Sequence, residues 1–304
     1  MTGLQTRFIL SRDDKRLRIT IWEAAPDKAP RGVCVLLGGQ TEFLEKYQEV
    51  AGELSARGFT VAALDWRGQG ASERLVPEPL KAHVGDFAEY DVDLAAFFDQ
   101  IVRPLTDKPP LALAHSMGGH ILMRALHDRP GLFAAAVVTA PMLRALTRGY
   151  PRLLARAACY TQNMLGRQQD WVWGMETRDP LKITFEDNLV TSDRARYARN
   201  TALLVARNDI RLAGPTWGWL GAATRSMGCV TAKGYAETIE TPVLIVGAGR
   251  DRIVDTQAAR EFAPRLPHGA YLEIADAEHE ILMESDSVRA RFWAAFDAFV
   301  GKYF

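Results

Sequence analysis

The sequence has few cysteines, no excess of either charge and no long apolar run. Its three cysteines, Cys34, Cys159 and Cys229, are odd in number and widely spaced, which excludes a disulfide framework and the usual zinc-binding spacings. Basic and acidic residues number 37 each, so the formal net charge is zero and predicts no nucleic-acid partner. No apolar segment approaches the roughly 20 residues that a membrane-spanning helix needs.

Two further absences narrow the function. The chain has no phosphate-binding glycine fingerprint at the start of a strand–helix unit and no cluster of metal-ligating side chains, so we expect neither a cofactor nor a metal. Charged residues between Arg7 and Arg16 interrupt any apolar core, so we expect no signal peptide and a cytoplasmic location. With 304 residues, 48% of them hydrophobic, the chain has the size and composition of one large α/β domain, with or without an insertion.

The segment 111–119, Leu-Ala-Leu-Ala-His-Ser-Met-Gly-Gly, carries the clearest catalytic motif. Residues 111–114 predict a short buried strand, and the apolar spacing after Gly118 predicts a helix. Ser116 would then lie in the sharp turn between them, as the nucleophile of a Gly-x-Ser-x-Gly elbow does. Ala114 replaces the first glycine of that pattern. The alternative is that Ser116 is an ordinary helix N-cap.

Strand and helix signals alternate along most of the chain. A hairpin is expected at 7–22, buried strands at 33–37, 59–64, 111–114, 133–139, 241–246 and 270–274, and helices at 44–54, 86–102, 118–126, from 256 and at 286–300. This alternation predicts a mostly parallel sheet with helices on both faces. Residues 141–236 show no clear strand, so we expect a helical cap inserted between two parts of the core, 1–140 and 237–304.

A serine nucleophile needs an imidazole base, and the base needs a carboxylate that orients it. In this kind of fold the acid and then the histidine follow the serine, each at the C-terminal end of a strand. His279, after the last predicted strand, is the one histidine that meets this condition. Asp251, after the strand before it, is the expected acid. Asp255 is an alternative but resembles a helix N-cap, and Asp276 is a weaker one.

The oxyanion formed during acyl transfer needs two preorganised N–H donors. We expect one from the backbone of Met117, directly after the nucleophile, and one from Gln40 in the glycine-bearing loop 38–41. That loop could also be a plain strand-to-helix turn. His115 abuts Ser116, and its side chain is expected on the opposite side of the elbow.

Together these motifs resemble the α/β-hydrolases, and more narrowly the branch of bacterial lysophospholipases and monoacylglycerol lipases, often filed as serine aminopeptidase-like. The matching stretches are AHSMGG at 114–119, DWRGQGAS at 65–72, HVGDFAEYDVDL at 83–94, NLVTSDRARYARN at 188–200 and GPTWGWL at 214–220. The resemblance implies an α/β-hydrolase fold with a helical cap over the active site, and Ser116, Asp251 and His279 as its triad. One departure is Gly38-Gly39, where the family often has His-Gly.

The predicted function is therefore a serine hydrolase that cleaves the carboxylic ester of a single-chain lipid, a lysophospholipid or monoacylglycerol, through an acyl-enzyme. The alternatives are a small-ester hydrolase, an aminopeptidase-type hydrolase and, less favoured, a non-catalytic binding module on the same fold.

The predicted cap carries the side chains that would select the substrate. Four tryptophans are expected to line a pocket for an alkyl chain, although any one could instead belong to the cap's own core: Trp171, Trp173, Trp217 and Trp219. Four arginines recur at helical spacing: Arg144, Arg148, Arg152 and Arg156. They suggest a helix that rests transiently on an anionic membrane surface, with a solvated basic face as the alternative.

Overall fold

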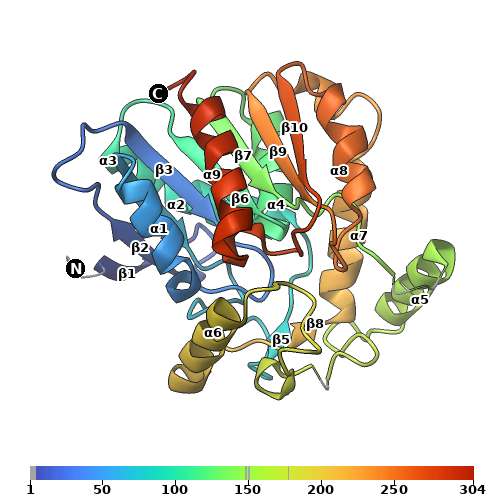
Figure 1. The fold of residues 1–304 in the computed structure, drawn as a ribbon. Coiled ribbons are helices and arrows are strands. Elements are labelled where there is room, and N and C mark those ends of the chain that lie inside the picture. Colours follow the sequence, from blue (N-terminus) through green and yellow to red (C-terminus); the bar gives the residue numbers. More distant parts are fainter. Residues whose placement is uncertain (1–4, 148, 150, 177) are drawn as a thin grey trace.

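A computed structural model of the protein describes residues 5–147, 149, 151–176 and 178–304 (Figure 1). In this part of the chain, eight strands form one sheet in the order β1-β2-β4-β3-β6-β7-β9-β10. β1 and β2 form an antiparallel hairpin, β2 runs antiparallel to β4, and the remaining neighbours are parallel. The strands are β1 (Gln5–Leu10), β2 (Arg16–Trp22), β3 (Gly32–Leu37), β4 (Phe59–Leu64), β6 (Leu111–His115), β7 (Ala135–Thr139), β9 (Val243–Ala248) and β10 (Gly269–Ile274).

The central strands are buried on both faces, as their continuous apolar runs predict. In β3, Val33, Val35 and Leu37 face one apolar core, whereas Cys34 and Leu36 face the other. Successive side chains of a strand point to opposite faces, so one short apolar run contributes to both cores.

Helices cover both faces of the sheet. Those packed on the first core are α2 (Ala88–Phe97), α4 (Met117–Asp128), α7 (Trp217–Val230) and α8 (Thr256–Phe262). Those packed on the second are α1 (Gln48–Ser55) and α9 (Asp286–Val300), which cross the near face in Figure 1. After α2, a π-helical turn (Phe98–Val102) leads into α3 (Arg103–Leu105). The predicted mostly parallel sheet with helices on both faces is confirmed.

Between β7 and β9 the chain forms α5 (Arg152–Met164), α6 (Arg194–Ala206), α7 and a two-residue strand, β8 (Gly214–Pro215), paired with β5 (Lys81–Ala82). The expectation of no strand in this segment was wrong in that detail. A Gly-Pro pair is too short to show the alternation of apolar and polar residues that predicts a strand. α7 also shares the first core with α4 through Trp219, Ala222 and Ala223. The division into a core (1–140 and 237–304) and a cap (141–236) stays a prediction, since α7 joins the two.

The predicted four-arginine helical face does not form. α5 begins at Arg152, directly after Pro151, so Arg144 precedes the helix. Arg144 and Arg152 instead both bind the carboxylate of Asp255, at 3.1 and 2.8 Å. Arg148 lies outside the described residues. No helix within the described ranges combines the length and apolar character that crossing a bilayer requires.

Candidate active site

Ser116 lies in a sharp turn between β6 and α4. Its backbone has φ 50° and ψ −113°, a conformation rare for a residue with a side chain. Such strain persists where the surroundings impose it. A side chain on Gly118 would approach the carbonyl oxygens of Leu37 and Gly38 to 2.4 and 2.5 Å, so only glycine lets the start of α4 pack on the loop after β3. The predicted strand–turn–helix is therefore confirmed.

The structure brings together the three residues predicted as a triad. His279 Nε2 lies 3.0 Å from Ser116 Oγ, and His279 Nδ1 lies 2.7 Å from Asp251 Oδ2. The other carboxylate oxygen, Asp251 Oδ1, accepts hydrogen bonds from the N–H groups of Ile253 (2.8 Å) and Val254 (2.9 Å). The side chains of Asp251 and His279 are 0% and 6% exposed. This arrangement fixes the carboxylate and directs it at the imidazole.

The alternative acids lie elsewhere. Asp255 is the N-cap of α8, where its side chain accepts from the N–H of Gln257. Asp276 pairs with Arg291 at 2.6 Å on the surface. Neither has a described contact with His279.

His115 was expected to point away from the nucleophile, and that expectation was wrong. Its ring lies 4.8 Å from the ring of His279, and its Nδ1 lies 3.1 Å from Thr139 Oγ1. Burial lowers the pKa of His115 to about 4, only partly offset by the nearby carboxylate of Glu42. A neutral imidazole therefore lies beside His279 at physiological pH.

The two expected N–H donors both lie near Ser116. Met117 is the first residue of α4, where N–H groups have no partner within the helix. A side chain on Gly39 would lie 3.2 Å from Ser116 Cβ, which shows how closely the loop after β3 approaches Ser116. In the described part of the chain, the N–H groups of Gln40 and Met117 have no protein acceptor. Both are thus available to a ligand.

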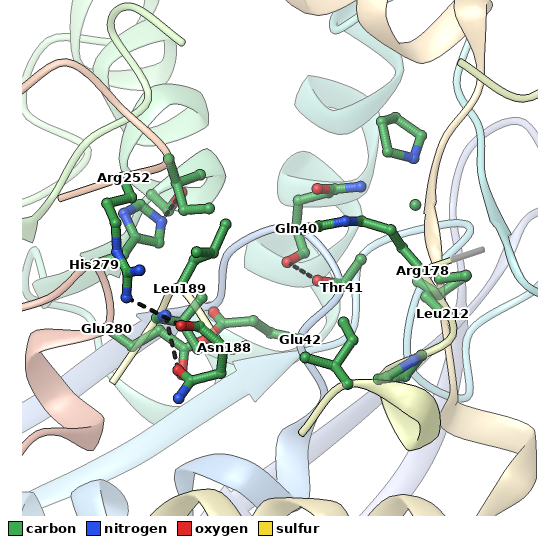
Figure 2. A pocket seen from close by; sticks show the side chains of 18 of the residues that line it. Gln40, Thr41, Glu42, Arg178, Asn188, Leu189, Leu212, Arg252, His279 and Glu280 are labelled. Carbon is green, nitrogen blue, oxygen red and sulfur yellow. Dashed lines mark hydrogen bonds between the residues drawn. The ribbon is translucent and has the colours of Figure 1, made fainter. Parts of the chain in front are cut away.

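A cavity of about 400 Å³ is lined by Ser116 and His279 (Figure 2). Most of its wall is apolar. It comes largely from the region predicted as the cap, which includes the loop after β7 and α7, and from the loop after β9. The larger apolar residues in the wall include Phe43, Met142, Leu146, Met175, Ile183, Leu189, Leu204, Leu212, Trp219, Leu220, Met227 and Ile253. Its largely apolar wall suits an alkyl chain.

Of the four tryptophans expected to line this pocket, the structure places Trp219 in its wall, where Nε1 donates to the hydroxyl of Tyr90 at 3.2 Å. Trp217, two residues earlier on α7, faces another side of the helix and packs edge-to-face on Trp173. Trp173 is 65% exposed, and Trp171 lies beneath the ammonium group of Lys81. These three are not among the residues that line the cavity, because they contact one another, Lys81 and solvent instead.

A buried cluster of charges borders the same cavity. Lys46 Nζ lies 2.7 Å from Glu42 and 2.6 Å from Glu280, the residue after His279. Burial by itself would raise the pKa of Glu42, but Lys46 and hydrogen bonds outweigh it and lower that pKa to about 2. Burial raises the pKa of Glu280, and Lys46 only partly opposes the shift. Glu42 is therefore ionised throughout the physiological range.

A family model described as serine aminopeptidase, S33 matches residues 28–286. The chain belongs to the serine aminopeptidase S33 family. Lysophospholipase L2 of Escherichia coli K12 is 34% identical to it over 265 residues, which cover 85% of this chain and 77% of that protein. The monoacylglycerol lipase of Mycolicibacterium smegmatis is 27% identical, covering 83% of this chain and 80% of the relative. The resemblance seen in the sequence is thus confirmed.

The fold of this S33 family member is also confirmed by solved structures. A soluble variant of the monoglyceride lipase of Saccharomyces cerevisiae matches with a TM-score of 0.77, covering 100% of this chain and 98% of that one at 17% identity. At that identity the match establishes the α/β-hydrolase fold alone. Within the described residues, no group of three or more His, Cys, Asp or Glu side chains is arranged to hold a metal ion.

Sequence reasoning about this S33 family member missed the charged cluster and Gln69, whose side chain contacts both Thr41 and Met117. The Glu42–Lys46 spacing of four residues was a visible signal, because such pairs meet on a helical turn. Nothing in the sequence indicated that Glu280 would complete the cluster.

Proposed function

We propose that this S33 family member is a serine hydrolase that cleaves the carboxylic ester of a single-chain lipid, a lysophospholipid or monoacylglycerol, through an acyl-enzyme. The observation that carries the proposal is the hydrogen-bonded chain from Asp251 through His279 to Ser116 at the wall of an apolar cavity. The names of its relatives, a lysophospholipase and a monoacylglycerol lipase, support this substrate class.

In the proposed reaction, His279 Nε2 takes the proton of Ser116 as Oγ attacks the ester carbonyl. The N–H groups of Gln40 and Met117 stabilise the resulting oxyanion. His279 then gives the proton to the leaving alcohol, and a water activated in the same way releases the fatty acid. Asp251 keeps the proton of the neutral imidazole on Nδ1, so that Nε2 is free to accept.

Neutral His115 favours this chemistry. The imidazolium that forms transiently at His279 has no second cation beside it, since burial keeps His115 uncharged. Two adjacent positive rings would disfavour the proton transfer.

The cavity supports an acyl chain as the recognised part of the substrate. Each methylene buried against its wall would contribute about 0.8 kcal/mol. Trp219 is the tryptophan that we propose contacts the chain, and Met142 and Met227 provide flexible thioethers beside it. A channel shaped for one chain would exclude lipids with two, which favours lysophospholipids and monoacylglycerols.

We still propose that the protein contacts an anionic membrane surface. The contact would be made by an apolar face of α5 and not by the four arginines. This helix projects from the body of the molecule in Figure 1. The exposed residues on α5 and directly after it include Leu153, Leu154, Arg156, Tyr160, Met164 and Leu165. A helix with such a face lies at the boundary of headgroups and acyl chains, and Arg156 complements anionic headgroups. A cytoplasmic location also stays a prediction, to be checked by cell fractionation.

The test is release of fatty acid from a panel of lysophospholipids, monoacylglycerols, short esters and aminoacyl amides. Ser116→Ala should remove essentially all activity, and a serine-directed fluorophosphonate should label Ser116 alone. Ser285→Ala, at the partly exposed serine that forms the N-cap of α9, is the control and should change neither result. Activity above a few per cent in Ser116→Ala would refute the mechanism. A profile led by short esters or by aminoacyl amides would replace the lipid substrate with the small-ester or the aminopeptidase alternative.

A further inference from the structure

The loop after β3 has three consecutive backbone N–H groups, those of Gly39, Gln40 and Thr41, and they differ in their hydrogen bonding. Gly39 donates to Glu42 Oε2, and Thr41 donates to Gln69 Oε1 at 2.5 Å. The N–H of Gln40, between them, has no acceptor in the described chain. The loop therefore holds its two outer N–H groups with side-chain acceptors and leaves the central one for a ligand.

Gln69 contacts both halves of the proposed oxyanion site. Its amide oxygen accepts from Thr41, and its amide nitrogen lies 3.7 Å from the sulfur of Met117. The side chain is 1% exposed, so these contacts replace water. The loop that carries Gln69 is anchored in turn by Asp65, which accepts from the N–H groups of Ala71 and Leu44.

The backbone at Thr41 needs such a partner. Its φ of 63° lies in the left-handed region, which is unfavourable for a residue with a side chain. The hydrogen bond that the N–H of Thr41 donates to Gln69 Oε1 can hold that conformation. Without it, rotation of the adjacent peptides would change the direction of the N–H of Gln40.

Glu42 fixes the other end of the turn. Besides Gly39, it accepts from the hydroxyl of Tyr47 and from Lys46 Nζ. Lys46 also binds Glu280, the neighbour of His279. A continuous chain of buried contacts therefore joins the loop that carries the base to the loop that carries the oxyanion donor.

We propose that Gln69 and Glu42 are positioning residues, which hold residues 39–41 so that the N–H of Gln40 points at the carbonyl oxygen of the substrate. The inference rests on the proposed function, because it concerns the oxyanion of the same reaction. Gln69 is not among the residues that line the cavity, and Glu42, which lies in its wall, accepts from the N–H of Gly39. Both act through the backbone of the loop.

The experiment compares each ester substrate with its thiono analogue, in which sulfur replaces the carbonyl oxygen. Sulfur accepts hydrogen bonds poorly, so the ratio of the two rates measures stabilisation by the oxyanion donors. Gln69→Met removes the acceptor for Thr41 at nearly constant volume. We expect kcat per fluorophosphonate-titrated site to fall at least tenfold, toward the about 10²- to 10³-fold cost of losing one donor. The oxo/thiono ratio should fall by a similar factor, with KM changed less than threefold.

Counting titrated sites removes misfolded protein from the comparison. Gln162→Met is the matched control, because Gln162 is also a buried glutamine but lies on α5, outside the cavity wall. It should leave the ratio unchanged. Glu42→Gln tests the second residue: its amide oxygen can still accept from Gly39, but its NH2 group opposes Lys46, so the ratio should again fall.

An oxo/thiono ratio within twofold of wild type in both Gln69→Met and Glu42→Gln would overturn the positioning role. If Ser116→Ala is inactive in the same assay, that result leaves the proposed function standing. Hydrolysis that survives Ser116→Ala would instead refute the proposed function, and the positioning role with it.

Discussion

Replacing Asp251 with asparagine should remove most hydrolysis, because the structure assigns a different task to each carboxylate oxygen. Oδ1 accepts from two backbone N–H groups, those of Ile253 and Val254, whereas Oδ2 faces His279 Nδ1. The amide oxygen of asparagine would stay with the two backbone donors. Its NH2 group would then face Nδ1 and force the imidazole into the tautomer that carries its proton on Nε2. That nitrogen could no longer accept the proton of Ser116.

The expected loss follows from this tautomer change. In the serine-protease triad, the same substitution lowers kcat about 10⁴-fold. A 10⁴-fold loss equals about 5.4 kcal/mol of activation free energy. We expect a fall of about 10³- to 10⁴-fold here, because Asp251 is as fully buried as that mechanism requires. The free energy of unfolding should change by no more than about 2 kcal/mol, since both backbone hydrogen bonds survive.

The assay is hydrolysis of a chromogenic ester below its micellar concentration, with urea unfolding as the check on folding. Asp276→Asn and Asp255→Asn are matched controls that also test the alternative acids. Asp276→Asn should leave kcat within twofold of wild type, because Asp276 contacts Arg291 on the surface. A loss of less than tenfold in Asp251→Asn, or an equal loss in Asp255→Asn, would refute the assignment.

Three further predictions follow from the cavity, α5 and a buried histidine. First, kcat/KM should rise about fourfold per methylene, the equivalent of 0.8 kcal/mol, until the cavity is full; a maximum at acetyl or propionyl esters would exclude an acyl channel. Second, the double variant Leu153→Glu, Met164→Glu should co-sediment less with anionic vesicles, whereas Val205→Glu, equally exposed on α6, should not; equal binding by all three proteins would refute a role for α5. Third, burial lowers the pKa of His120 to about 3 from 6.5, so between these values the unfolded state alone binds the proton. His120 should therefore cost about 2 kcal/mol of unfolding free energy between pH 7 and pH 5. His120→Gln should reduce the pH dependence of urea unfolding by that amount, and an unchanged slope would contradict it.

Local features of the fold could be predicted from the sequence because they depend on residues that are neighbours in the chain. The apolar run at 111–114 and the glycines after Ser116 predict strand, turn and helix without reference to any other segment. That Asp251 and His279 would lie near Ser116 could be predicted for a related reason. Parallel strands end at one edge of the sheet, so residues at their C-terminal ends meet there.

The contacts that could not be predicted from the sequence depend on which segments the sheet brings together. Glu280 and Lys46 are 234 positions apart, and they meet because the loops after β3 and β10 converge over the same edge. Likewise, Trp217 and Trp219 are equivalent in the sequence, yet only Trp219 lies in the cavity wall, because their side chains leave α7 in different directions.

The sequence by itself therefore predicted the kind of chemistry, because the candidate residues had to follow particular strands. Only the tertiary structure decided what surrounds that chemistry. His115 lies against His279, and Gln69 joins the two loops that supply the proposed oxyanion donors. The physical reason is that backbone conformation follows mainly from local sterics and periodicity, whereas the partner of a buried side chain is set by the packing of distant segments.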